Sequence, residues 1–104
     1  MHVVILVTVP DDKQADFIAQ KLVEARLVAC VNIVSGVRSL FWWEGKVDQA
    51  KETLLIIKTR KALTGKLVKK VKSLHKYTVP EIIALPIIAG NKEYLDWINE
   101  STRK

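Results

Sequence analysis

The sequence predicts an α+β domain of the ferredoxin-like class, in which two split βαβ units form one antiparallel sheet. Two observations favour this class. Four strand-like runs and two amphipathic helical patterns follow one another in the order βαββαβ, and a short helical pattern ends the chain. The chain has 104 residues, about the length of one domain, and no linker or internal repeat divides it. We therefore expect a single domain over residues 1–104.

The first strand is predicted at residues 3–9, an almost unbroken run of β-branched and aliphatic side chains. Asp11 and Asp12 follow Pro10 and can cap a helix by accepting hydrogen bonds from its free N–H groups. The apolar positions of that helix recur at helical spacing: Ala15, Ile18, Ala19, Leu22 and Val23. Gln14 falls outside this stripe. The pattern predicts an amphipathic helix with one buried face.

A long hairpin is predicted over residues 28–60. Ser35-Gly36 interrupts its first strand as a bulge or bend, because glycine within a strand often marks one. Glu44-Gly45 is expected to form the turn, with the glycine supplying a positive φ. The returning strand has four consecutive large aliphatic residues at its centre, over residues 54–57.

The second half of the chain supplies the remaining elements. Leucine and valine residues spaced three and four apart predict a helix over residues 63–74. Pro80 ends any continuation, because the residue before a proline disfavours the helical region. The fourth strand is predicted at residues 82–88, and Pro86 within it argues for an edge position or a bulge. Asn91 is expected to cap the terminal helix. The apolar face of that helix holds Tyr94, Leu95 and Ile98.

The predicted strands hardly alternate between apolar and polar side chains, so both faces of the sheet are expected to be apolar. Helices cover only one face of a ferredoxin-like sheet, and a large exposed apolar patch usually marks an interface. We therefore expect copies of the chain to bury sheet faces or edges between them. Trp42 and Trp43 near the hairpin tip agree with this, because aromatic residues are enriched at interfaces. Packing of both tryptophans on their own domain is the alternative.

The composition points to a cytoplasmic protein. Cys30 is the only cysteine, so an internal disulfide is impossible and a reducing compartment is the simpler expectation. The apolar start of the chain lacks the basic residues of a signal peptide and is too short for a membrane helix. The net charge of +6 is explained by lysines on solvated helix faces. We expect neither a nucleic acid nor a membrane as partner.

Three classes of function are compatible with this element order. RNA recognition needs aromatic side chains on the central strands, and residues 53–58 contain none. An acylphosphatase-like hydrolase needs an anion-binding loop with an arginine after the first strand. Residues 9–12 are acidic there and lack glycine and arginine, which disfavours anion binding. The third class is an oligomer that responds to a metal or a small ligand.

The residues that favour this third class are Cys30, His75, Tyr77 and Glu81. A thiolate and an imidazole suit copper, or zinc with added carboxylates. Each has a structural alternative: Cys30 as a small buried side chain, and His75 as a cap on the last carbonyls of a helix. His2, close to the terminus, is expected to be incidental.

Several short motifs recur in a fixed order along almost the whole chain. They occupy residues 29–34, 42–47, 55–59, 75–82, 84–86, 90–91 and 94–97. Together they resemble the CutA divalent-cation tolerance family. The resemblance implies a non-enzymatic homotrimer with a shape like that of the PII signalling proteins, in which strands of neighbouring subunits extend each other's sheets. It also implies copper or another divalent metal ion as ligand, with no cofactor required for folding.

The resemblance further implies a site in a cleft between subunits. It assigns His75 and Glu81 as contacts for a metal or small ligand, followed by Cys30. The residues that line the cleft would be Trp43, Lys58 and Tyr77. Lys76 stands where the family commonly has proline, which makes the loop after His75 less rigid. The alternatives are that these residues serve interface packing, and that the trimer is a signalling or scaffold module acting through an unknown protein partner.

Overall fold

The computed structural model describes residues 1–103, and its elements follow the predicted order. They are β1 (His2–Val9), α1 (Asp12–Glu24), β2 (Cys30–Trp43), β3 (Lys46–Arg60), the short 3-10 helix η1 (Lys61–Leu63), α2 (Thr64–Leu74), β4 (Ile82–Ile87) and α3 (Lys92–Ser101). The strands form one sheet in the order β2-β3-β1-β4, and every pair of neighbours is antiparallel. This is the predicted ferredoxin-like α+β arrangement.

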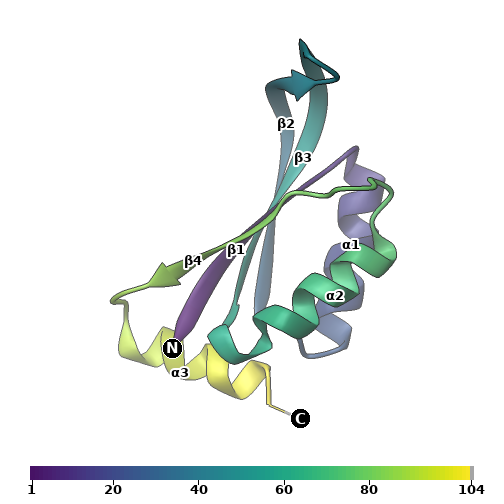
Figure 1. Cartoon of the computed structure of the whole chain (residues 1–104). Coiled ribbons are helices and arrows are strands. Elements are labelled where there is room, and N and C mark those ends of the chain that lie inside the picture. The colour runs from purple at the N-terminus through teal and green to yellow at the C-terminus, as the bar shows by residue number, and fades with distance from the viewer. Residues whose placement is uncertain (104) are drawn as a thin grey trace.

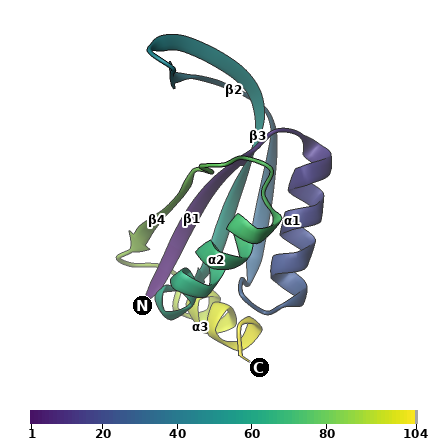
Figure 2. The same cartoon turned by 45° about the vertical axis from the view of Figure 1, so that its right-hand side comes forward.

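One face of the sheet is covered by α1 and α2, which lie beside each other across it (Figures 1 and 2). Alternate residues of β1 and β3 point to this face, because successive side chains of a strand lie on opposite sides. They form the core with side chains from both helices and from the segment before β2. Its buried members are Val3, Ile5, Val7, Val9, Ala15, Ile18, Leu22, Val28, Leu55, Ile57, Leu67 and Val71.

The predicted apolar stripe of α1 was wrong at two positions. Gln14 is buried, with 7% of its surface exposed, whereas Val23 is 46% exposed. The reason is a contact between helices: Gln14 Nε2 donates to the Leu74 carbonyl at 2.9 Å, at the end of α2. A carbonyl in the last turn of a helix has no partner within that helix, so the buried amide satisfies it.

The bulge and the turn predicted for the hairpin are confirmed. The register of β2 and β3 shifts between Val34 and Val37, and Gly36 there has a φ of +75°. Glu44 and Gly45 both have positive φ, 50° and 77°, as a two-residue turn of type I′ requires. The hairpin extends well beyond the helices, so its end stands clear of the rest of the chain (Figures 1 and 2).

The side chains near the tip of the hairpin are exposed. Trp42 is 75% and Trp43 58% exposed, so these tryptophans do not pack on their own domain. Leu40, Phe41 and Val47 are also exposed. The alternative prediction, that both tryptophans pack on their own domain, is therefore wrong for a single chain.

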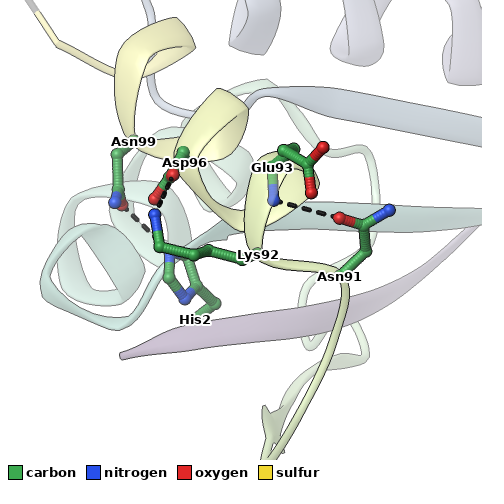
Figure 3. Close-up of polar contacts among 6 residues, drawn as sticks. All are labelled: His2, Asn91, Lys92, Glu93, Asp96 and Asn99. Atoms are coloured by element: carbon green, nitrogen blue, oxygen red, sulfur yellow. Dashed lines mark hydrogen bonds and ion pairs between the residues drawn. The ribbon is translucent and has the colours of Figure 1, made fainter.

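Predicted helix caps and the edge strand are also confirmed. Asp11 Oδ1 accepts from the Gln14 N–H at 2.8 Å, and Asn91 Oδ1 accepts from the Glu93 N–H at 3.0 Å. Figure 3 shows the Asn91 cap at the start of α3. Strand β4 lies at an edge of the sheet, where Pro86 removes no hydrogen bond to a further strand.

The second face of the sheet has the predicted apolar side chains, together with polar ones such as Asn32 and Lys58, and the chain covers part of it with α3. His2 Nε2 lies 2.9 Å from Asn99 Oδ1, so His2 joins β1 to α3 and is not incidental (Figure 3). The same end is tied by Arg60, which donates from Nε to Thr102 Oγ1 at 2.8 Å. Away from α3, apolar side chains of this face remain partly exposed: Val34 41%, Ile83 49% and Leu85 48%.

Among residues 1–103, no helix combines the length and the apolar character needed to cross a membrane.

Candidate functional site

His75 lies where α2 ends and is held between two backbone groups. Its own N–H donates to the Val71 carbonyl at 2.8 Å, which completes the last turn of the helix. The ring Nε2 lies 2.8 Å from the Thr8 carbonyl oxygen, and Nδ1 accepts from the Tyr77 N–H at 3.0 Å. Since a carbonyl only accepts and an N–H only donates, the ring hydrogen is on Nε2. The imidazole thus joins α2 to β1 and does not cap the last carbonyls of its helix.

Tyr77 extends this cluster to β3. Its hydroxyl donates to Glu52 Oε2 at 2.9 Å, and its ring centroid lies 4.7 Å from that of His75. Burial, followed by the hydrogen bond and negative charge of Glu52, raises the pKa of Tyr77 to about 12. The hydroxyl therefore stays protonated and remains a hydrogen-bond donor at neutral pH. Glu52 itself is only 8% exposed.

Asp12 connects the start of α1 to the hairpin. One carboxylate oxygen accepts from Thr53 Oγ1 at 2.6 Å and from Ser35 Oγ at 2.8 Å. These hydrogen bonds, from Thr53 first, lower the pKa of Asp12. A small depression of about 200 Å³ opens beside this carboxylate. It is bounded by Pro10, Asp11, Asp12, Gly36, Lys51, Glu52 and Thr53.

The sequence analysis did not predict that Glu52 belongs to the cluster of His75 and Tyr77, and it expected Asp12 only as a helix cap. The sequence carried no signal for this role, because Glu52 stands in a mostly polar run, residues 48–53, that is typical of solvated strand residues. Its partner Tyr77 lies 25 positions later, and the sequence alone does not indicate this pairing.

A second polar group lies farther along the sheet, near α3. Cys30 and Lys58 are paired across β2 and β3, with Lys58 Nζ 4.0 Å from Cys30 Sγ. Lys58 also donates to Asn32 Oδ1. Burial, and then the charge and hydrogen bond of Cys30, raise the pKa of Tyr94 on α3. Cys30 is half-buried among polar partners, so it is not the enclosed apolar side chain that was the alternative.

The predicted site residues do not form one site within a single chain. In the sheet, Lys58 lies opposite Val4 and Leu54 lies opposite Thr8, the residue that contacts His75. Four residues of strand separate these positions, which is about 13 Å. Trp43 lies at the hairpin tip, and Glu81 is exposed just before β4. Over residues 1–103, no three or more His, Cys, Asp or Glu side chains are grouped so that they could hold a metal ion.

The sheet order and the long projecting hairpin define an α+β protein of ferredoxin-like topology. The family model described as "CutA1 divalent ion tolerance protein" matches residues 3–101. The chain belongs to this CutA1 family, as its motifs predicted.

Relatives in bacteria, archaea and plants share the whole fold. The divalent-cation tolerance protein CutA of Thermus thermophilus is 54% identical over 102 residues, covering 98% of this chain and 99% of that protein. Its solved structure has a TM-score of 0.97 and 53% identity, covering 99% of this chain and 100% of that one. The Archaeoglobus fulgidus structure, described as a periplasmic divalent cation tolerance protein, also has a TM-score of 0.97, with 46% identity and coverage of 99% and 100%.

The rice relative, "Protein CutA 1, chloroplastic", is 50% identical over 98% of this chain, which spans 58% of its length. The bacterial and archaeal relatives are named for tolerance of divalent cations, and their names state no reaction. One relative is named periplasmic and another chloroplastic, so these names do not confirm the predicted cytoplasmic location.

Proposed function

We propose that the protein acts in divalent-cation tolerance as a non-enzymatic homotrimer that binds a metal ion, copper first, or a small ligand between subunits. The observation that carries the proposal is the apolar surface that one chain leaves uncovered. It includes the sheet face beyond α3 and the end of the hairpin, where Ile83 is 49% and Trp42 75% exposed. Apolar surface of this extent is typical of a protein interface.

The two polar groups support a ligand site shared between copies. One contains His75 with Tyr77 and Glu52, and the other contains Cys30 with Lys58. They are about 13 Å apart along one sheet, so a single ion could contact both groups only if they came from different chains. Thiolate, imidazole and carboxylate are donors that copper and zinc accept. His75, Glu81 and Cys30 are the residues that would hold the ion.

The state of His75 sets a condition on metal binding. Both ring nitrogens have backbone partners, so a metal must displace either the Tyr77 N–H or the Thr8 carbonyl. This observation favours a second candidate function, a trimeric scaffold or PII-like signalling module with a protein partner, in which His75 holds the loop before β4.

Metal titration of the purified protein separates the two candidates. Copper(II) and zinc are titrated into the wild type, His75→Ala and His2→Ala, the last as a control that removes a histidine joined to α3 instead. Micromolar binding that is lost in His75→Ala and kept in His2→Ala supports the metal site. Binding that both variants keep supports the scaffold. Sedimentation equilibrium tests the assembly, and a monomer at micromolar concentration would refute the proposed trimer.

The cytoplasm remains our proposed location. The single cysteine, Cys30, is half-buried and unpaired, which suits a reducing compartment. Fractionation of the source cells tests this, and recovery outside the cytoplasm would contradict it.

A further inference from the structure

We propose that the lysine-rich outer face of α2 binds a small polyphosphate anion. The positive charge of the protein is concentrated in one segment. Between Glu52 and Glu81 the chain contains no aspartate or glutamate. Its basic residues there are Lys58, Arg60, Lys61, Lys66, Lys69, Lys70, Lys72 and Lys76. The rest of the chain has more acidic than basic residues, so this segment accounts for the net charge of +6.

Part of this charge surrounds a shallow depression of about 390 Å³ between α2 and the end of α1. Lys66, Lys69 and Lys70 lie along one side, and Ala25 and Leu27 contribute apolar surface opposite. Residues three and four apart on a helix are neighbours, with Cβ atoms roughly 5–6 Å apart. The three ammonium groups can therefore reach one ligand together. Ser73 also borders the depression, but its hydroxyl donates to the Lys70 carbonyl at 2.6 Å.

These lysines have no acidic partner in the structure. Among residues 1–103, the ion pairs are Lys92–Asp96 and Arg103–Glu100, at α3. Glu24, the acidic residue next to Ala25, accepts from Gln20 instead. Like charges at i, i+3 and i, i+4 repel one another on a helix. A bound anion would remove this repulsion.

The helix dipole does not account for the whole cluster. Lys72 lies in the last turn of α2, where the dipole favours a positive charge. Lys66 lies in the first turn, where the dipole disfavours one, and no acidic residue is present there. A ligand contact explains the position of Lys66.

The geometry points to a compact ligand with several linked negative charges. Lysine binds phosphate as a point charge with several N–H donors, and a depression of this volume suits a small molecule. An extended nucleic acid strand would need a longer groove with aromatic side chains for base stacking. No residue that borders this depression is aromatic.

Calorimetric titration with sodium tripolyphosphate at low salt tests the proposal. We expect binding that weakens as sodium chloride is added. The variant Lys66→Gln/Lys69→Gln/Lys70→Gln should bind about tenfold more weakly or worse, since contacts to charged groups are strong. Glutamine keeps the helix propensity of lysine, so the fold should persist. Circular dichroism checks this, and the single variant Lys66→Gln gives a milder second test.

The matched control is Lys13→Gln/Lys46→Gln/Lys51→Gln, which removes the same three charges elsewhere from the net +6. It should change the affinity less than about twofold when both variants are compared at about 0.1 M sodium chloride, because exposed charges more than roughly 10 Å from the ligand are then largely screened. Equal weakening in both triple variants would refute the site, and so would absence of binding by the wild type at low salt.

Two further probes identify the source of the phosphate. Vesicles of phosphatidylcholine and phosphatidylglycerol in equal parts, bound more tightly than tripolyphosphate through the same three lysines, would assign the site to lipid headgroups and overturn the assignment to a small anion. Single-stranded RNA bound more tightly than tripolyphosphate through those lysines would overturn the assignment to a small anion. None of these measurements depends on the proposed metal site.

Discussion

Replacing His75 is expected to lower the free energy of unfolding by an amount that follows from its two ring contacts. His75 is 9% exposed, and its ring holds the Thr8 carbonyl at 2.8 Å and the Tyr77 N–H at 3.0 Å. Each hydrogen bond contributes about 1 kcal/mol net. Loss of the buried ring surface adds about 1 kcal/mol more. His75→Ala should therefore lower the free energy of unfolding by about 3 kcal/mol.

Two isosteric variants separate the contacts. The amide nitrogen of His75→Gln can take the place of Nε2 and keep the bond to Thr8, whereas the amide oxygen of His75→Asn can take the place of Nδ1 and accept from Tyr77. The bond to the Thr8 carbonyl is buried, whereas the bond from the Tyr77 N–H is only partly buried. Losing the Thr8 contact should cost more. The expected order of stability is wild type, then Gln, then Asn, then Ala.

The assay is equilibrium unfolding in guanidinium chloride, followed by circular dichroism at one fixed protein concentration, because assembly makes stability depend on concentration. The slope with denaturant should be unchanged, so the midpoint reports stability. The reasoning is refuted if His75→Ala lies within about 0.5 kcal/mol of the wild type, which is the size of a neutral surface change. It is also refuted if the asparagine variant is more stable than the glutamine variant.

Other substitutions test the remaining contacts of the fold. Leu67→Ala, at a core position with no exposed surface, should lower the free energy of unfolding by about 2–5 kcal/mol in the same assay, and a smaller loss would mean that the core refills the space. Folding raises the pKa of Tyr77 from 10.0 to about 12. The stability that comes from burying the neutral hydroxyl, and then from its bond to Glu52, is therefore complete below pH 10 and lost as the pH rises toward 12. In Tyr77→Phe, the free energy of unfolding should fall less as the pH rises through this range. When tyrosinate absorbance is followed against pH, this variant should lose the transition at the higher pH, and an unchanged titration would contradict the assignment. The hydrogen bonds of Asp12, from Thr53 first, lower its pKa below 3.8, so they stabilise the fold above that pH and are lost as the pH falls through the lowered pKa. In Asp12→Asn, the free energy of unfolding should fall less steeply as the pH is lowered. An equal slope in the variant and the wild type would exclude this role of Asp12.

Features that depend on neighbouring residues were predictable from the sequence. The order of strands and helices follows from apolar spacing, which reflects the helix and strand periods directly. Gly36 and Gly45 supply positive φ angles at the bulge and the turn. Asp11 and Asn91 cap the helices that begin beside them.

The contacts that build the candidate site were not predictable in this way. His75 reaches Thr8 across 67 positions, Tyr77 reaches Glu52 across 25, and His2 reaches Asn99 across 97. The same imidazole at the end of α2 could equally have capped its own helix.

The sequence by itself determined the local conformations of this protein, its apolar strands and its family, because these depend on side-chain types within a few residues. Only the tertiary structure decided that Cys30 and His75 lie at separate ends of the sheet, that Gln14 is buried and that α3 covers part of the second face. Those outcomes depend on strand register and on contacts between helices and strands that lie far apart in the sequence. Contacts between segments far apart in the chain depend on how the whole fold packs, so the caps and the apolar spacing within each segment do not specify them.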